Sequence, residues 1–363
     1  WVFGPEDIAS VIKYVAPAVD GSLTVSLAEH RFYDHHYDVE LRPVRSARLR
    51  LLRRLIAGPW LLGRLASRAR GFLYLGATGF LLDTVDSRQT EFAFLSRRGI
   101  RIACCFVGDD IRAPRLMHEM ERRTGRPNVS SRVSELSPEF ETDRYDDLKR
   151  EVARVADEFS DLIFNSPTDQ LSYLRRPTHR VPFLFPDVLF ESTTDKFSDV
   201  TRPLVVHAPT APAIKGTDRV RAAVQQLRDE GYDFEYLQLE GVRNDEVLRT
   251  LRRAHIVLNQ FYASMPGQLG FESLASRCVL LQSADETVER TLPAGANEAW
   301  LVTGPEEIAD HLRGLLDEPS RWRDQAERGW EWAWRHYSMS QAGPALNAIL
   351  VAALETPSRP ERP

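Results

Sequence analysis

Lysine and cysteine are scarce in this chain. Its 363 residues include four lysines beside 43 arginines, so the position of each lysine is informative. The three cysteines are too few for a disulfide framework, and no two of them have the spacing of a metal site. We therefore expect reduced, buried thiols and a cytoplasmic protein.

Long hydrophobic runs and an excess of positive charge are missing as well. No apolar run reaches the roughly 18 residues that a membrane-spanning helix needs, and the opening WVFGPEDIAS does not resemble a secretion signal. The net charge of −5 lacks the positive excess that is typical of nucleic-acid-binding proteins, so we expect no nucleic-acid partner. A hydrophobic content of 43% with 27% charged residues is typical of a globular protein, and the length predicts two domains.

Short apolar runs alternate with helical patterns along the chain. In the first half, strands are expected at 1–3, 23–27, 71–75, 101–107, 161–165 and, from a weaker signal, 180–183. In the second half they are expected at 203–207, 234–239, 256–260, 279–282 and 300–302. The alternation predicts parallel βαβ units. The expected fold is therefore α/β, with two doubly wound, Rossmann-like domains facing each other across a cleft.

The boundary between the two series of βαβ units is expected in residues 185–202, which are polar and lack periodicity. After about residue 302 the pattern is helical to about residue 354. The final segment, TPSRPERP, is polar and Pro-rich, so we expect it to fray.

The stretch HAPTAPAIKGTDR, residues 207–219, places a lysine between a strand and a helix. A helix N-terminus carries unpaired N–H groups and partial positive charge, which suit a phosphate. Lys215 adds a full charge just before such a terminus, and Gly216 lets the backbone pass close to a ligand. The alternative is an ordinary capped helix beside a solvated lysine.

A second stretch, SMPGQLGFESLASRCVLL at residues 264–281, places glycines at the start of a helix. Gly267 and Gly270 follow the strand HIVLNQFYA, and Glu272 lies in the first turn. Such glycines offer backbone N–H groups to a phosphate. A carboxylate one turn further can accept hydrogen bonds from two neighbouring hydroxyls, as ribose presents. The alternative for Glu272 is a favourable interaction with the helix dipole alone.

Together the two stretches resemble the nucleotide-sugar half of GT-B glycosyltransferases, in particular the retaining group 1, or family 4-like, enzymes. Lys-Gly after the first strand and Gly-x-x-Gly-x-Glu after a later one lie about 55 residues apart. The resemblance covers residues 203–285 well and the first half more loosely. It implies an acceptor-side domain at 1–190, a nucleotide-sugar domain at 191–337, and a helix within 338–363 that returns to the first domain.

The resemblance implies an enzyme of the hexosyltransferase type. It would move a sugar from a nucleoside-diphosphate sugar, such as a UDP-sugar, to a hydroxyl of a polysaccharide, glycolipid or other glycoconjugate. Retention of configuration and the absence of a cofactor or metal are implied as well. The donor-site positions that match the family are Gly4, Lys215, Gly216, Glu240, Val242, Gly267, Gly270 and Glu272.

The resemblance also implies a role for each kind of donor-site residue. Lys215 matches the lysine that contacts the diphosphate, and Glu272 matches the glutamate that holds the ribose hydroxyls. Glu240 and Val242 lie in the turn where the nucleobase rests. Gly4 ends the first strand, where the chain approaches the donor phosphates, although any strand-to-helix turn can carry a glycine.

Two positions depart from the family pattern. The first glutamate of the paired-glutamate motif falls on Ser264, and an arginine common before the lysine falls on Thr210. Both losses concern contacts to the donor sugar and diphosphate. They motivate an alternative function, in which the chain is a catalytically inactive homologue that binds nucleotides or acts as a scaffold.

The strand at 101–107 is followed by Gly-Asp-Asp, at the end of a parallel strand where ligands bind. This stretch resembles glycosyltransferases that carry Gly-Ser-Asp-Ile-Arg at this point. We expect Asp109 and Asp110 as catalytic candidates, because a carboxylate there can orient a sugar hydroxyl or act as a base. The alternatives are that Asp110 pairs with Arg112 or caps a helix.

Residues 42–70 hold nine arginines and no acidic residue, with leucines, an isoleucine and a tryptophan between them. A basic amphipathic pattern of this kind binds anionic membrane surfaces. It predicts a peripheral protein at the inner face of the cell membrane, with a sugar or lipid-linked acceptor. The alternative is a solvated helix pair whose apolar sides enter the core.

Overall fold

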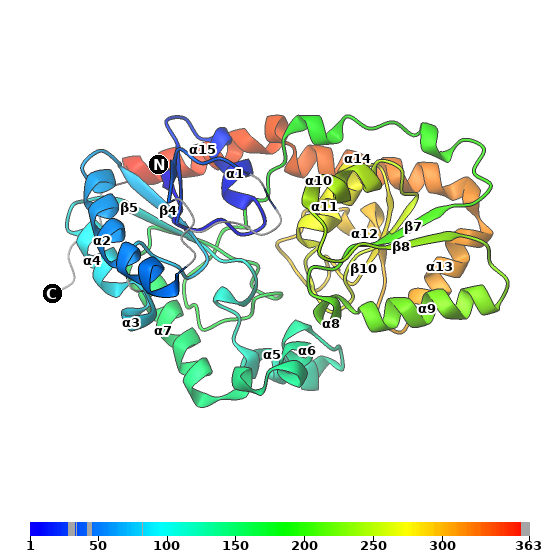
Figure 1. Ribbon diagram of the computed structural model, residues 1–363, viewed down its shortest axis with the longest axis horizontal. Coiled ribbons are helices and arrows are strands. Elements are labelled where there is room, and N and C mark those ends of the chain that lie inside the picture. Colours follow the sequence, from blue (N-terminus) through cyan, green and yellow to red (C-terminus); the bar gives the residue numbers. More distant parts are fainter. Residues whose placement is uncertain (28–32, 34, 42–45, 82, 357–363) are drawn as a thin grey trace. The chain divides into compact units, whose positions relative to one another are not determined.

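Two parallel sheets carry the fold, one of six strands and one of five. The computed structural model describes residues 1–27, 33, 35–41, 46–81 and 83–356. All strand pairs within these residues are parallel, and α-helices connect most of the successive strands (Figure 1). The predicted α/β class with two doubly wound, Rossmann-like sheets is therefore confirmed. Residues 357–363 of the tail predicted to fray lie outside the described residues.

The chain divides into two compact units. Unit 1 comprises residues 1–116, 141–184 and 343–363, and unit 2 comprises residues 117–140 and 185–342. Each unit holds one of the two sheets.

The sheet of unit 1 consists of β1 (Val2–Phe3), β2 (Leu23–Ser26), β3 (Val39–Glu40), β4 (Gly71–Leu75), β5 (Arg101–Cys105) and β6 (Leu162–Phe164). Its order is β3-β2-β1-β4-β5-β6. All residues of the central strands β4 and β5 are buried, because both faces of a parallel sheet are covered. The accompanying helices are α1 (Val11–Val15), α2 (Ala47–Ala66), α3 (Asp83–Asp86), α4 (Gln89–Ser96), α7 (Asp143–Phe159) and most of α15 (Met339–Glu355).

The sheet of unit 2 consists of β7 (Leu204–His207), β8 (Glu235–Gln238), β9 (Ile256–Leu258), β10 (Val279–Gln282) and β11 (Leu301–Val302), in the order β11-β10-β9-β7-β8. Its helices are α8 (Pro212–Lys215), α9 (Thr217–Asp229), α10 (Asn244–Leu251), α11 (Gly267–Ala275), α12 (Ala296–Ala299), α13 (Ile308–Asp317) and α14 (Trp322–Tyr337). Apolar side chains of α9, α13 and α14 pack against the sheet and form a buried core with it. Leu227, Leu312 and Trp322 are examples, one from each helix.

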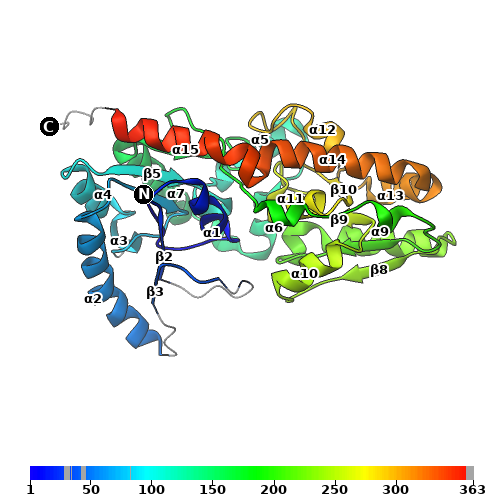
Figure 2. The ribbon, with the colours of Figure 1, turned by 90° about the horizontal axis from the view of Figure 1, so that it is seen from above.

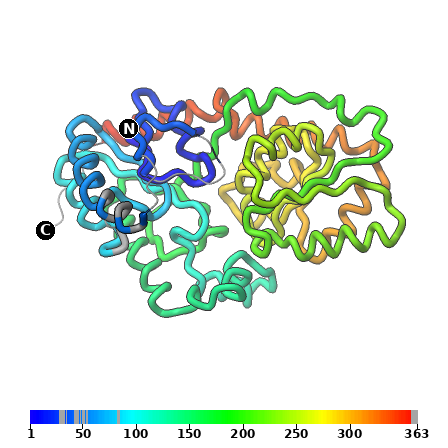
Figure 3. The backbone as a smooth tube through the Cα atoms, in the orientation of Figure 1, coloured from blue at the N-terminus to red at the C-terminus, as the bar shows by residue number. Residues whose placement is uncertain are grey.

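An excursion of the chain, residues 117–140, leaves β5 and returns into α7 (Figure 3). It contains most of α5 (Pro114–Thr124) and all of α6 (Val129–Leu136). The side chain of Asn128 caps α6 by accepting hydrogen bonds from the N–H groups of Ser130 (2.9 Å) and Ser131 (3.4 Å). From the sequence, this segment was expected in the N-terminal domain (1–190), whereas its contacts group it with unit 2.

Two details of the predicted strands are wrong. Residues 180–183 form no strand, and an isolated bridge between Phe164 and His179 precedes them. The edge strand β3 was not predicted, and its residues Val39 and Glu40 are only half-buried and exposed, respectively.

Candidate functional site

Gly216 joins two helices at the carboxyl end of β7. It ends α8 and precedes α9 with a φ of +78°, in the left-handed region that favours glycine. A Cβ at this position would lie 3.3 Å from the ring of Tyr262 and 3.4 Å from Phe261. Glycine is therefore needed both for the backbone turn and for close packing against the loop that follows β9.

Lys215 is tied to that same loop through a glutamine. Its Nζ donates a hydrogen bond to Oε1 of Gln260, and Nε2 of Gln260 donates to the carbonyl of Met265. Gln260 thus connects the lysine to the backbone two residues before Gly267. The structure brings together the two stretches that sequence analysis singled out. Gln260 was missed, although its place directly after an apolar strand was a usable signal.

His207, the last residue of β7, supports the start of α9. Its Nδ1 lies 2.6 Å from the carbonyl of Leu258, so Nδ1 donates, and Nε2 then accepts from the Thr217 hydroxyl at 2.8 Å. Burial lowers the pKa of His207 to about 4. The ring is therefore neutral near pH 7 and supplies no charge to an anion.

Gly267 and Gly270 lie in the first turn of α11. A Cβ at Gly270 would stand 2.8 Å from Nδ2 of Asn259 and 3.0 Å from Oε1 of Gln282. These two buried amides are hydrogen-bonded to each other at 2.7 Å, at the ends of β9 and β10. The small residue lets α11 approach the strand ends closely, so its N-terminal N–H groups lie at the carboxyl edge of the sheet.

Glu272 is a buried carboxylate one turn into α11. Its Oε1 accepts hydrogen bonds from Nδ2 of Asn244 (3.0 Å) and Nε2 of Gln268 (3.1 Å). Burial outweighs these bonds and raises the pKa of Glu272 to about 7. Within the described part of the chain, no hydrogen bond to Oε2 is found, so this oxygen retains its capacity to accept one.

Glu240 and Val242 lie in the turn after β8, as predicted, shortly before α10. The Glu240 carboxylate is exposed and accepts from Arg221 at 3.0 Å, while Val242 is half-buried. Asn244, the first residue of α10, links this turn to Glu272. The turn and the carboxylate are thereby held next to each other.

A pocket of about 540 Å³ lies beside Ser264 in unit 2. Loops after β9, β10 and β11 form part of its wall, and the excursion contributes Met120, Thr124, Arg126, Pro127 and Asn128. Arg126 forms an ion pair with Asp285 at 3.2 Å among these lining residues. The pocket places free volume next to the position where the family pattern has a glutamate.

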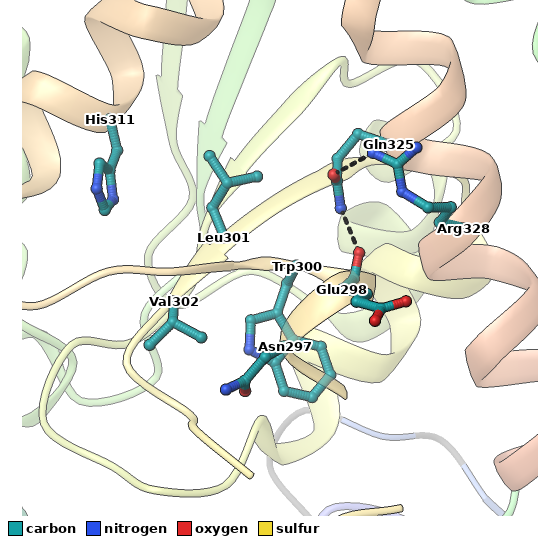
Figure 4. Close-up of a pocket in the computed structure, with 8 residues that line it drawn as sticks. All are labelled: Asn297, Glu298, Trp300, Leu301, Val302, His311, Gln325 and Arg328. Carbon is teal, nitrogen blue, oxygen red and sulfur yellow. Dashed lines mark hydrogen bonds between the residues drawn. The ribbon is translucent and has the colours of Figure 1, made fainter. Parts of the chain in front are cut away.

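Another pocket, of about 520 Å³, lies along the edge strand β11 (Figure 4). Gln325 donates to the carbonyl of Glu298 at 2.9 Å and accepts from Arg328 at 2.7 Å. None of the predicted donor-site residues lines it.

In unit 1, Gly4 directly follows β1 and is buried between the neighbouring strands. Its N–H donates to the carbonyl of Leu73 at 3.1 Å, and a Cβ would lie 2.4 Å from the carbonyl of Val25. Any larger residue would collide with the backbone of β2. The position therefore has a packing reason for glycine that is independent of a ligand.

The two aspartates after β5 have different surroundings. Asp109 forms an ion pair with Arg112, which also pairs with Asp169 at 3.0 Å. Asp110 accepts from the N–H of Val107 at 3.0 Å, and burial raises its pKa to about 6. The alternative pairing of Asp110 with Arg112 is wrong, since Arg112 binds Asp109 instead. The pKa of Asp110 suits proton transfer near neutral pH.

A third carboxylate of this edge was missed by sequence analysis. Glu6, just after β1, accepts a hydrogen bond from the hydroxyl of Thr78, just after β4. Between these strand ends and that of β5, a Cβ at Gly76 would lie 3.0 Å from Oδ1 of Asp110. Adjacent strands thus bring Glu6, Thr78 and Asp110 to one edge of the sheet.

No group of three or more His, Cys, Asp or Glu side chains within the described residues is arranged to hold a metal ion. Among the helices described, none combines the length and the apolar character needed to cross a membrane.

Comparisons with known proteins agree on the fold. Residues 213–346 match a family model described as glycosyl transferase-like. Among solved structures, Anabaena HepE in complex with UDP-glucose is 12% identical with a TM-score of 0.59, covering 97% of this chain and 99% of its own. An α-glucosyltransferase bound to UDP-glucose and abasic DNA is 10% identical with a TM-score of 0.61, covering 96% and 98%. WaaG, a glycosyltransferase of lipopolysaccharide biosynthesis, is 12% identical with a TM-score of 0.56, covering 98% of each chain. No curated protein sequence matches this chain significantly.

Proposed function

We propose that this chain is a group 1 glycosyltransferase of the GT-B fold. It transfers a hexosyl group from a nucleoside-diphosphate sugar to a hydroxyl acceptor, with retention and without a metal. The bond between the anomeric carbon and the diphosphate oxygen breaks, and the diphosphate leaves with the electron pair. The acceptor oxygen bonds to that carbon and loses its proton. We assign the donor to residues 191–337 and the acceptor to residues 1–190.

The observation that carries this proposal is the connection from Lys215 through Gln260 to the Met265 backbone. It holds a cation beside the N-termini of α9 and α11 at the carboxyl edge of one sheet. Negative charge develops on the leaving diphosphate, so fixed donors and a cation at this edge stabilise the transition state without reorganisation. Glu272, which lies on α11, supplies a hydrogen-bond acceptor for the ribose hydroxyls.

Asp110 is our proposed acceptor of the proton from the attacking hydroxyl. A pKa of about 6 leaves it ionised at neutral pH, and Glu6 and Thr78 follow neighbouring strands at the same edge of unit 1. The charge of Asp109 is compensated by Arg112. We therefore propose that Asp109 holds the loop after β5 in place and does not take the proton.

We propose a UDP-hexose as donor and a saccharide or glycolipid as acceptor. Two structurally similar proteins have UDP-glucose bound, and a third acts in lipopolysaccharide biosynthesis. The pocket beside Ser264 has room for a hexose, since about 540 Å³ lies within the range of small-ligand sites.

A two-step experiment tests this function. Calorimetry with UDP, GDP and ADP measures whether a nucleoside diphosphate binds, and release of UDP from UDP-glucose measures transfer to water. We expect one diphosphate to bind and slow release of UDP. Binding without release would favour the alternative, an inactive nucleotide-binding partner, which Ser264 and the exposed Thr210 motivate. No binding of any diphosphate would contradict the transferase and the nucleotide-binding partner, and would leave the scaffolding role.

We further propose that α2 binds an anionic membrane surface. Its side chains Leu52, Leu55, Ile56 and Trp60 are exposed by 44–64%, whereas Leu61 and Leu62 on the other side are buried in the core of unit 1. The helix stands at the side of the unit (Figure 2). Arg48 and Arg64 are exposed along it, and Arg68 is exposed just beyond its end. Residues 42–45 of the predicted basic segment lie outside the described residues. Apolar side chains beside arginines match a lipid interface.

Vesicle flotation tests the membrane proposal. We expect binding at low salt to vesicles of equal parts phosphatidylglycerol and phosphatidylcholine, and release as salt screens the arginines. The double variant Ile56→Ser/Trp60→Ser should lower the bound fraction about tenfold or more, because each buried side chain contributes roughly 1.5–3 kcal/mol. Val351→Ser, an exposed valine on α15, is the matched control. Failure of the wild type to float removes the proposal.

A further inference from the structure

The excursion packs on the loops that would hold the diphosphate. Val129 and Val133 of α6 form a buried cluster with Tyr262 and Ala263 of the loop after β9. Ile214, the residue before Lys215, packs against the same cluster. Helix α6 therefore contacts both α8, which carries Lys215, and the loop after β9, although it comes from the first half of the sequence (Figure 1).

Arg132, on the same helix, contacts both the loop after β9 and the first turn of α9. Its guanidinium lies 5.2 Å from the centre of the Tyr262 ring, a cation–π distance. Its Nη2 lies 3.4 Å from a carboxylate oxygen of Asp218, in the first turn of α9. Its Nη1 pairs with Glu135 one turn along α6, which fixes the orientation of the side chain.

The surroundings of Arg132 strengthen these contacts. Its side chain is 23% exposed, and Nε is buried without a hydrogen-bond partner among the residues described. A partly desolvated guanidinium interacts more strongly with an aromatic face than an exposed one does. The ring of Tyr262 in turn lies where a Cβ of Gly216 would be only 3.3 Å away. Tyr262 therefore packs closely on the turn that follows Lys215.

We propose that Arg132 is a positioning residue for the diphosphate site: it fixes Tyr262 against Gly216 and holds the first turn of α9 through Asp218, so that Lys215 and the α9 N-terminus keep one geometry. This inference rests on the proposed function. Arg132 acts through Lys215 and does not itself touch the ligand. Preorganised donors favour the charged leaving group because no reorganisation is needed during the reaction.

The test compares UDP with uridine, which lacks the phosphates, on the full-length protein. Arg132→Met keeps an aliphatic side chain but removes the charge and the ion pair. We expect it to weaken UDP binding about fivefold to tenfold, the scale of one cation–π or ion-pair contact, and to leave uridine binding unchanged. Arg132→Lys, which restores the charge, should recover part of the UDP affinity. Arg123→Met, at an exposed arginine of α5, is the charge-matched control.

A purely structural role would lower the melting temperature and weaken both ligands equally, and that result would overturn the inference. So would UDP binding unchanged in Arg132→Met. If the wild type binds no diphosphate, the proposed function fails and the inference falls with it, which distinguishes the two failures. A second measurement uses the Lys215→Met background. There the loss caused by Arg132→Met should shrink to less than twofold, because residues that act as one unit are not additive.

Discussion

Replacing Lys215 by methionine is expected to weaken binding of a nucleoside diphosphate by about 10- to 100-fold. The change removes one charge-assisted hydrogen bond to the diphosphate and keeps most of the apolar stem. Gln260 already holds the ammonium group next to the α11 loop, so little ordering is lost when a ligand binds. The positive charge of Lys215 also stabilises the negative charge that develops on the leaving diphosphate. The variant should therefore release UDP from UDP-glucose more slowly than the wild type.

Calorimetry with UDP and with uridine measures this prediction. The loss should appear for UDP and be absent for uridine, and it should shrink at high salt as the charge is screened. Arg228→Met is the matched control, because it removes one positive charge from the exposed last turn of α9. Equal UDP affinity in wild type and Lys215→Met would show that the lysine does not contact the phosphates.

Much of the fold was predictable because its signals are local. The central strands β4, β5, β7 and β10 are buried on both faces, so each appears in the sequence as a short, nearly continuous apolar run between helical patterns. The destination of α6 was not predictable. Val129 and Val133 show which side of the helix is apolar, but hydrophobic burial is non-directional, and either unit could have covered that side.

The candidate site divides in the same way. Lys215 and Glu272 were predicted as site residues from the sequence, since glycine turns before helices have a sequence signature. Their partners Gln260 and Asn244 were not, because amides carry no pattern until the strand ends are placed side by side. Asp109 and Asp110 are adjacent in sequence and chemically alike. Only the packed structure distinguishes them, because Asp109 pairs with Arg112 whereas Asp110 is buried.

Replacing Glu272 by glutamine is expected to stabilise the protein and weaken the nucleotide site at once. Burial raises the pKa of Glu272 from 4.5 to about 7, so the folded state keeps a proton that the unfolded state has released. The free energy of unfolding therefore falls as pH rises from about 4.5 to 7 and levels off above that range. The total corresponds to roughly 3 kcal/mol against the ionised form. Glutamine avoids this cost and keeps the oxygen that accepts from Asn244 and Gln268.

Urea unfolding should then show Glu272→Gln more stable than the wild type by on the order of 2 kcal/mol at pH 8, and equally stable at pH 4. UDP affinity should move the other way and fall about tenfold at pH 8, because a neutral amide is a weaker acceptor for the ribose hydroxyls than a carboxylate. Wild-type affinity should also rise relative to the variant as pH passes through 7. Glu246→Gln, at an exposed glutamate in the first turn of α10, should change neither quantity. A variant that gains stability and binds UDP as well as the wild type would assign Glu272 to the fold alone, since only a ligand contact makes the two effects oppose each other.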